Sequence, residues 1–220
     1  MDGFVQNWIR ENLMIKEAEK NIAADININK LVTDYRSSLL VYNYEKFLVE
    51  TKLDTVVTEE EKAHFYKENK GQYLLSHPIF KCIVVKLPAK SSGIQTLKTK
   101  LEKNDWYEMT DLIKAKATTY YLDTVQYWTL DDIHPIVPEG MISLSGLAGN
   151  KVLTKKVKDS EYLIKIVRYY KEHEVPPMDF IESKIVKSIL SERKIQLLNR
   201  YRQDLYDKAV KENKFEIFKN

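Results

Sequence analysis

The chain has 220 residues, of which 44% are hydrophobic and 30% are charged, so it can bury a substantial core and lacks the composition of a disordered protein. Its 35 basic and 32 acidic residues leave a net charge of +3. Because the two signs are interspersed along the sequence, nucleic-acid binding is not indicated. The single cysteine, Cys82, excludes an internal disulfide and any metal site built from several cysteines.

No stretch of the sequence approaches the ~20 apolar residues that a membrane-spanning helix needs, so we expect no transmembrane segment. The first residues, Met1-Asp2-Gly3, do not open a secretory signal. The sequence contains no P-loop, no GxGxxG, no GxSxG and no HExxH motif, and its histidines have no partner at ligand spacing. We therefore expect no metal and no cofactor.

Two helices are predicted in the N-terminal part of the chain. Apolar residues recur every three to four positions from Phe4 to about residue 20, and again from Leu31 to Leu48. The second helix should contain about 25 residues, and it carries aromatic side chains on more than one side. Three of these side chains could form a peptide-binding surface or pack against another helix: Tyr35, Tyr42 and Tyr44.

A third helix leads into the first strand. Thr58 and Glu61 have the spacing of a capping box, which predicts a helix that begins at about Glu59. Gly71 is typical of the position that follows a helix. The β-branched and apolar residues from Phe80 to Leu87 then predict a strand that ends before a proline.

The middle of the sequence alternates between helical and extended patterns. Two short helices are predicted between Ile94 and Ala117, separated near Asn104 and Asp105. The proline, glycine and serine residues of 134–149 predict a loop. Three further strands are expected, at residues 124–130, 152–157 and 162–169. The predicted order from the first strand onward is therefore β-α-α-β-β-β.

The longest periodic run lies near the C-terminus, from Ile181 to Val210. It predicts a helix of about 30 residues, which Asp179 or Ser183 could cap. Such a helix exposes an apolar stripe unless it packs against other helices, and residues 4–70 offer suitable partners.

These elements predict an α+β fold in which the two ends of the sequence form one discontinuous helical lobe around an inserted α/β module. The expected parts are an N-terminal helical lobe at 1–75, the module at 76–174, and a C-terminal helix at 175–220 that packs back on the N-terminal lobe.

Six segments of the chain have a distinctive order and spacing: FVQNWIRENLMIKEAEK (4–20), YRSSLLVYNYEKFL (35–48), TEEEKAHFYKENKGQY (58–73), CIVVKLP (82–88), EYLIKIVRYY (161–170) and MDFIESKIVKSILSERK (178–194). In this order they resemble the SurA/PpiC family, which comprises parvulin-type peptidyl-prolyl isomerases and chaperones of the bacterial cell envelope. The resemblance covers most of the chain and implies that the inserted module is parvulin-like.

The resemblance also implies a degenerate active site. Active parvulins resemble one another in a histidine that opens the first strand and a second histidine in the last strand, and these positions fall here on Cys82 and Tyr162. His77 would enter the cleft only if the register were shifted. Cys82 could be a nucleophile, but no motif supplies its base, and a buried strand cysteine is the simpler interpretation. Apolar residues of the central loop are candidates for a proline pocket: Met141, Leu144 and Leu147.

From this resemblance we expect a SurA-like holdase that binds unfolded or extended polypeptides, with outer-membrane proteins among the expected clients and a periplasmic or exported location. One alternative is an active isomerase in which Tyr162 and Cys82 flank the cleft. Another is a structural subunit of an envelope complex. The apolar faces of residues 4–50 could pair within one chain or between two, so a homodimer is one of the expected arrangements.

Overall fold

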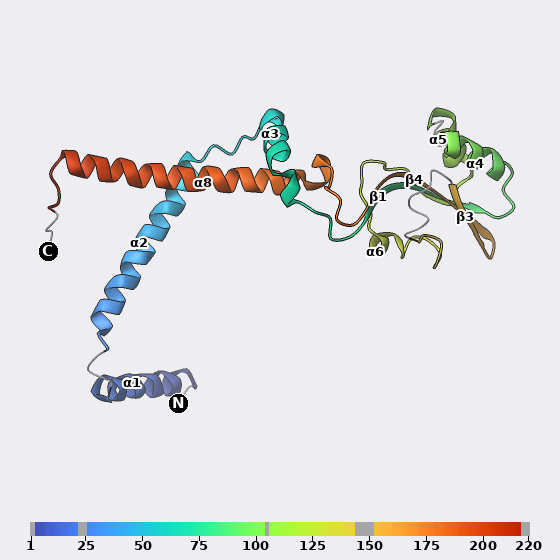
Figure 1. Ribbon diagram of the computed structural model, residues 1–220. Helices are drawn as coiled ribbons and strands as arrows, with labels where there is room; N and C mark the ends of the chain where they lie inside the picture. Colours follow the sequence, from blue (N-terminus) through green and yellow to red (C-terminus); the bar gives the residue numbers. More distant parts are fainter. Residues whose placement is uncertain (1–2, 22–25, 104–105, 144–151, 217–220) are drawn as a thin grey trace. The chain divides into compact units, whose positions relative to one another are not determined.

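The computed structural model describes residues 3–21, 26–103, 106–143 and 152–216 (Figure 1). These residues form helices and a four-stranded antiparallel sheet, so the predicted α+β class is confirmed. The chain divides into two compact units. We call them the terminal unit, Met1–Val56 with Leu190–Asn220, and the central unit, Val57–Ile189. The sequence-based domain boundaries after residues 75 and 174 remain a prediction.

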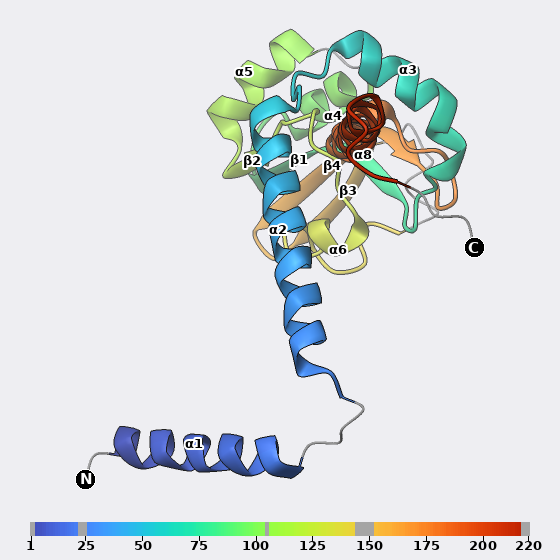
Figure 2. The ribbon, with the colours of Figure 1, turned by 90° about the vertical axis from the view of Figure 1, so that its left-hand side faces the viewer.

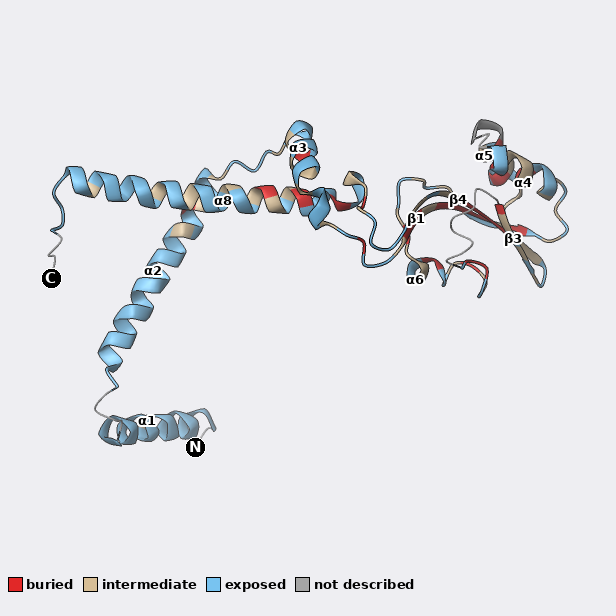
Figure 3. Ribbon diagram, in the orientation of Figure 1, coloured by how far each residue is buried: buried red, intermediate tan, exposed pale blue. Residues whose placement is uncertain are grey.

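The terminal unit consists of α1 (Gly3–Asn21), α2 (Ile28–Lys52) and the C-terminal part of α8 (Met178–Lys211). The side chain of Asn27 caps α2, because its Oδ1 accepts a hydrogen bond from the Lys30 amide at 2.9 Å. The expected length of about 25 residues for α2 is confirmed. None of the residues of α1 is buried, and α2 buries only Leu48, so both helices are mostly pale blue in Figure 3.

Polar contacts join α2 to the C-terminal part of α8. The hydroxyls of Tyr44 and Tyr201 lie 2.5 Å apart and their ring centroids 5.9 Å apart. Glu45 accepts hydrogen bonds from Arg202. Because only Leu48 of α2 is buried, these contacts hold the helix without burying an apolar face, and most of its apolar side chains remain in solvent.

The central unit begins with α3 (Glu59–Asn69) and the short 3-10 helix η1 (Lys70–Gln72). The predicted capping box is present: Thr58 Oγ1 accepts from the Glu61 amide at 3.3 Å, and Glu61 accepts from the Thr58 amide at 2.9 Å. A small apolar cluster connects α3 with the first turns of α8, and its buried members are Ile181, Ile185 and Ile189. This part of α8 therefore packs against α3, while the packing of the C-terminal helix on an N-terminal lobe of residues 1–75 remains a prediction.

The sheet consists of β1 (Ile79–Pro88), β2 (Thr119–Tyr121), β3 (Val152–Val157) and β4 (Ser160–Tyr170), in the order β2-β1-β4-β3. β1 pairs with β4 over its whole length, and β3 and β4 form a hairpin. Three of the four predicted strands therefore lie where the sequence places them.

Each face of the sheet has its own core. Helices α4 (Ile94–Lys103) and α5 (Trp106–Lys116) cover one face, and α6 (Leu130–Ile133) with the segment that follows covers the other (Figures 1 and 2). Side chains of β1 alternate between the two: Ile83 and Val85 face α4, whereas Cys82 and Val84 face α6. We call the second side the α6 face.

The predicted strand at 124–130 is wrong. Asp123 folds the chain into a turn instead, because its Oδ1 accepts from the Val125 amide at 2.7 Å. Thr129 and Asp132 then form a second capping box that starts α6. The neighbour of β1 on the side away from β4 is β2, which precedes the predicted strand in the sequence and is shorter than it. Within the predicted segment, Trp128 forms only an isolated bridge to Phe80.

The predicted caps of the C-terminal helix are also wrong, because α8 already begins at Met178. Asp179 lies in the first turn, where it accepts hydrogen bonds from Lys81 at 3.0 Å and from Tyr127 at 2.8 Å. Burial alone would raise the pKa of Asp179, but these hydrogen bonds lower it overall. Asp179 therefore ties the start of α8 to β1.

Lys62 supplies a polar link between α3 and α8. Its side chain is 7% exposed and donates hydrogen bonds to Glu59 and Glu182. The hydrogen bond to Glu182, followed by that to Glu59, raises the pKa of Lys62 above its usual 10.5. The ammonium therefore stabilises the fold fully below about pH 10.5, and this contribution disappears as pH rises through the higher folded-state pKa.

We predict that Lys62→Met lowers the melting temperature more than Lys67→Met, a matched change on the exposed side of α3. Thermal unfolding followed by circular dichroism from pH 7 to 11 measures this. The difference between the wild type and Lys62→Met should narrow above about pH 10.5. Equal melting temperatures for the two variants at pH 7 would contradict the assigned role of Lys62.

Candidate functional site

The α6 face of the sheet contains an open cleft of about 290 Å³ at the end of β1 nearest Pro88. Three strands and the segment after α6 line it. The lining residues are Val84, Lys86, Thr119, Tyr121, Pro135, Ile136 and Tyr162. The lining includes aliphatic side chains, hydroxyls and one ammonium, so the cleft combines apolar and hydrogen-bonding groups as ligand sites do.

The strand register determines which side chains meet in the cleft. Lys86 of β1 lies opposite Tyr162 of β4, with its Nζ 5.4 Å from the centre of the tyrosine ring. On its other side Lys86 lies opposite Thr119 of β2, and Val84 lies opposite Tyr121. Neighbouring strands thus bring together residues that are far apart in the sequence.

Of the two positions that the family resemblance aligns with the parvulin histidines, only Tyr162 lines this cleft. Cys82 points to the same face but lies opposite Ile166 and is 1% exposed. Four residues separate Cys82 from Lys86, the partner of Tyr162, which corresponds to about 13 Å along a strand. The structure therefore places Tyr162 at the cleft and Cys82 in the core beyond it.

The three loop residues predicted for a proline pocket are not among the described residues that line the cleft. Met141 is buried in the core of the α6 face with Ile142 and Val137, and it does not line the cleft. Leu144 and Leu147 lie outside the described residues. Lys86 and Ile136 also line the cleft and were not predicted from the sequence. The alternation of β1 could have identified Lys86, because it is the polar position that follows Cys82 and Val84 on one face.

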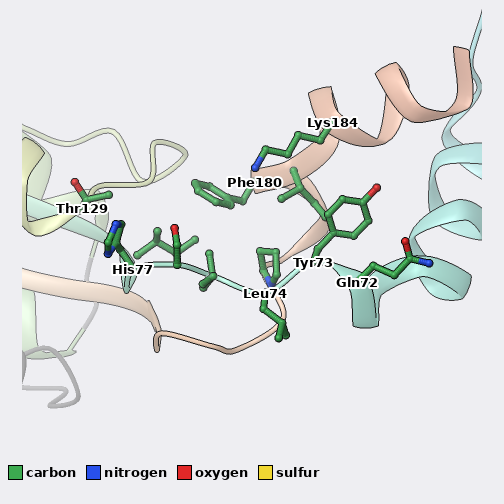
Figure 4. A pocket seen from close by; sticks show the side chains of 12 residues that line it. Gln72, Tyr73, Leu74, His77, Thr129, Phe180 and Lys184 are labelled. Atoms are coloured by element: carbon green, nitrogen blue, oxygen red, sulfur yellow. The ribbon is translucent and has the colours of Figure 1, made fainter. Parts of the chain in front are cut away.

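A second cavity, of about 330 Å³, lies where α8 begins (Figure 4). Phe180 and Lys184 of α8 face it from one side, and His77 and Thr129 lie at its other end. His77, the histidine that a shifted register would bring to the cleft, is exposed here before β1 and does not line the cleft. The cavity thus contains cationic and apolar groups, and no paired acid and base.

The three tyrosines proposed for peptide binding lie on α2 in the terminal unit. Tyr35 and Tyr42 are 67% and 64% exposed, and Tyr44 is 47% exposed while bonded to Tyr201. A groove of about 270 Å³ lies between α2 and α8 in this unit. Its walls are Val41, Tyr44, Glu45, Leu48, Leu198, Tyr201, Arg202 and Leu205.

Large apolar side chains continue along the terminal helices beyond this groove. We call the exposed apolar residues of α2 and of the C-terminal part of α8 the helical apolar surface. It comprises Ile28, Leu31, Val32, Tyr35, Leu39, Leu40, Val41, Tyr42, Tyr44, Phe47, Ile195, Leu205, Tyr206 and Val210. Side chains of α1 are exposed in the same way, including Phe4 at 81% and Trp8 at 58%. Exposed apolar area of this extent marks binding surfaces in soluble proteins.

Solved structures similar to this chain were found at low sequence identity. Two are chains of the SurA-like chaperones of Campylobacter jejuni, the virulence factor PEB4 and the periplasmic protein Cj1289. One is 16% identical over 98% of this chain and 84% of its own, with a TM-score of 0.37. The other is 13% identical over 94% of this chain and 77% of its own, with a TM-score of 0.34.

A third similar structure is the foldase protein PrsA from Streptococcus pneumoniae, 16% identical over 98% of this chain and 76% of its own, with a TM-score of 0.29. The similar structures are thus SurA-like chaperones and a PrsA foldase. No family model and no curated protein matches the sequence. The case for function therefore rests on the residues described above.

None of the described helices is long and apolar enough to cross a membrane. Within the described ranges, no three histidine, cysteine or acidic side chains form a group that could hold a metal ion.

Burial raises the pKa of the Cys82 thiol to about 12, because the apolar core disfavours the thiolate. We predict that a disulfide reagent such as Ellman's reagent does not label Cys82 in the native protein at pH 8, and labels it fully in guanidinium chloride. The reagent's absorbance measures both states. Rapid labelling of the native protein at pH 8 would contradict a buried, unreactive cysteine.

Proposed function

We propose that this chain is a SurA-like folding factor that binds unfolded or extended polypeptides through its helical apolar surface. The observation that carries the proposal is the exposure of α2, which buries only Leu48 while presenting aromatic and aliphatic side chains over its length. The sequence resemblance to the SurA/PpiC family supports the same function. By extension we propose a periplasmic or exported location and outer-membrane proteins among the clients.

The physical basis of such binding is transient burial of apolar surface. Client aromatic and aliphatic side chains would lie in the groove between Val41 and Leu205 and against exposed rings such as Tyr42. Burial of apolar area is non-directional, so a surface of this kind accepts many sequences. A protein that binds only unfolded chains withdraws them from aggregation by mass action.

We expect the purified protein to suppress aggregation of an unfolded outer-membrane protein at a one-to-one ratio, as measured by light scattering. Tyr42→Ser should weaken binding of the unfolded client roughly fivefold, a loss of ~1 kcal/mol that is typical of truncating one interface side chain. Tyr120→Ser, on β2 in the central unit, is the matched control and should have no effect. No suppression by the wild type would overturn the proposal.

Two other partners could cover the same surface. None of the residues of α1 is buried, so a second copy of the chain could cover its apolar side chains. We therefore include a homodimer in the proposal. Sedimentation velocity at several concentrations would detect it. Stable one-to-one association with a single folded protein, in place of weak binding to many unfolded chains, would instead indicate a structural subunit of an envelope complex.

The alternative function is peptidyl-prolyl isomerisation in the sheet cleft, and the observation that favours it is the position of Tyr162 there. Isomerisation must lower a barrier of ~20 kcal/mol, and the tyrosine hydroxyl could donate a hydrogen bond to the amide that rotates. The cleft residues that the structure describes include neither histidine nor any other group whose ordinary pKa lies near neutrality. We therefore propose that the module does not catalyse isomerisation.

Exchange spectroscopy of an X-Pro peptide by NMR tests this directly. We predict that an equimolar amount of the protein leaves the cis-to-trans exchange rate unchanged. Acceleration by the wild type that Tyr162→Phe reduces would establish the alternative and refute an inactive module.

A further inference from the structure

One row of side chains crosses all four strands on the α6 face at the cleft. The register places Thr119 of β2 beside Lys86 of β1, Lys86 beside Tyr162 of β4, and Tyr162 beside Lys155 of β3. The next row toward the core is Tyr121, Val84, Ile164 and Leu153, which is mostly apolar. The cleft therefore changes from apolar to cationic within two residues of strand.

The charge of this row is not compensated within the described part of the chain. Lys86 is half-buried and forms no ion pair with a described carboxylate; its charged group lies near the Tyr162 ring. Lys155 donates to the backbone carbonyl of Glu139, which leaves its positive charge in place. The nearest acidic residue on β4, Glu161, lies opposite Leu87 and points to the other face of the sheet.

Two tyrosine hydroxyls near Lys86 are available to donate hydrogen bonds to a ligand. Among the described residues, no hydrogen bond engages the hydroxyl of Tyr121 or of Tyr162, and both residues line the cleft. A half-buried ammonium with hydroxyl donors beside it favours an anion that accepts several hydrogen bonds. Val84 and Ile136, which also line the cleft, favour an adjoining apolar side chain.

We propose that this cleft is a second peptide-binding site, which recognises an extended segment carrying a carboxylate next to an apolar residue. Lys86 pairs with the carboxylate, the hydroxyls of Tyr121 and Tyr162 donate to it, and the neighbouring apolar side chain lies on Val84 and Ile136. The site requires no isomerisation, and it is independent of client binding by the helical apolar surface. Lys86 is then the residue that determines specificity.

Two blocked peptides of equal shape test the proposal on the full chain: acetyl-Ala-Glu-Pro-Phe-amide and acetyl-Ala-Gln-Pro-Phe-amide. Titrations followed by two-dimensional amide NMR give the affinity of each and the residues that shift. We expect the glutamate peptide to bind about 3- to 10-fold more tightly, with the largest shifts at Lys86 and Tyr162, and the preference to decrease with added salt.

Variants at Lys86 separate charge recognition from folding. Lys86→Met should equalise the two peptides, whereas Lys86→Arg should keep the preference for glutamate. Lys156→Met removes an exposed lysine from the opposite face of β3 and should change nothing. If Lys86→Met loses the native spectrum, Lys86→Gln replaces it, because this variant removes the charge but keeps a polar side chain of similar length, and it should equally abolish the preference for glutamate.

A further peptide pair distinguishes the two sources of a carboxylate. Acetyl-Ala-Gln-Pro-Phe with a free C-terminus, compared with its amide, shows whether a chain terminus binds in place of an acidic side chain; tighter binding of either acidic peptide supports the site. Equal affinity of all peptides for the wild type, or a glutamate preference that persists in Lys86→Met, would overturn the proposal. Shifts confined to α2 would also overturn it, while leaving client binding by the terminal unit intact.

Discussion

The antiparallel pairing of β1 with β4 is the constraint on which the central unit depends. The two strands stay in register from Ile79 opposite Tyr170 to Pro88 opposite Ser160, with one irregularity beside Cys82. This ladder separates the two apolar cores, since successive side chains point to opposite faces. It also sets Lys86 opposite Tyr162, so the composition of the cleft follows from backbone hydrogen bonds formed along the whole strand. If the pairing of β1 with β4 shifted by one residue, the side chains that now line the cleft would point to the opposite face of the sheet, and side chains of the core would take their place.

The terminal unit is organised by a different principle. Its helices form few buried contacts, and apart from Leu48 the described contacts between α2 and α8 are at or near the surface. Helices whose apolar faces remain in solvent gain little from tertiary packing, which is the main source of helix stability in most proteins. An apolar partner would supply that packing. The exposure of these helices therefore makes their stability sensitive to any partner that covers them.

Local signals in the sequence predicted local structure well. The capping box at Thr58, the helix of residues 28–52 and the hairpin strands β3 and β4 each follow from short-range patterns, and all are present. The segment 124–130 was mispredicted because its β-branched and aromatic residues look extended, while Asp123 and the Thr129–Asp132 pair direct the backbone into turns. The position of Tyr162 at the cleft followed from strand alignment. Lys86 could not be recognised as its neighbour without the register, which long-range pairing determines.

We propose that unfolded polypeptides bind to the helical apolar surface. Amide hydrogen exchange with and without a soluble unfolded client tests it most directly, because it reports each segment of the intact chain separately. We expect the client to slow exchange in α2 and in residues 190–211 of α8 and to leave exchange in the β1–β4 ladder unchanged. Unchanged exchange in α2 at saturating client, or protection confined to the sheet, would contradict it.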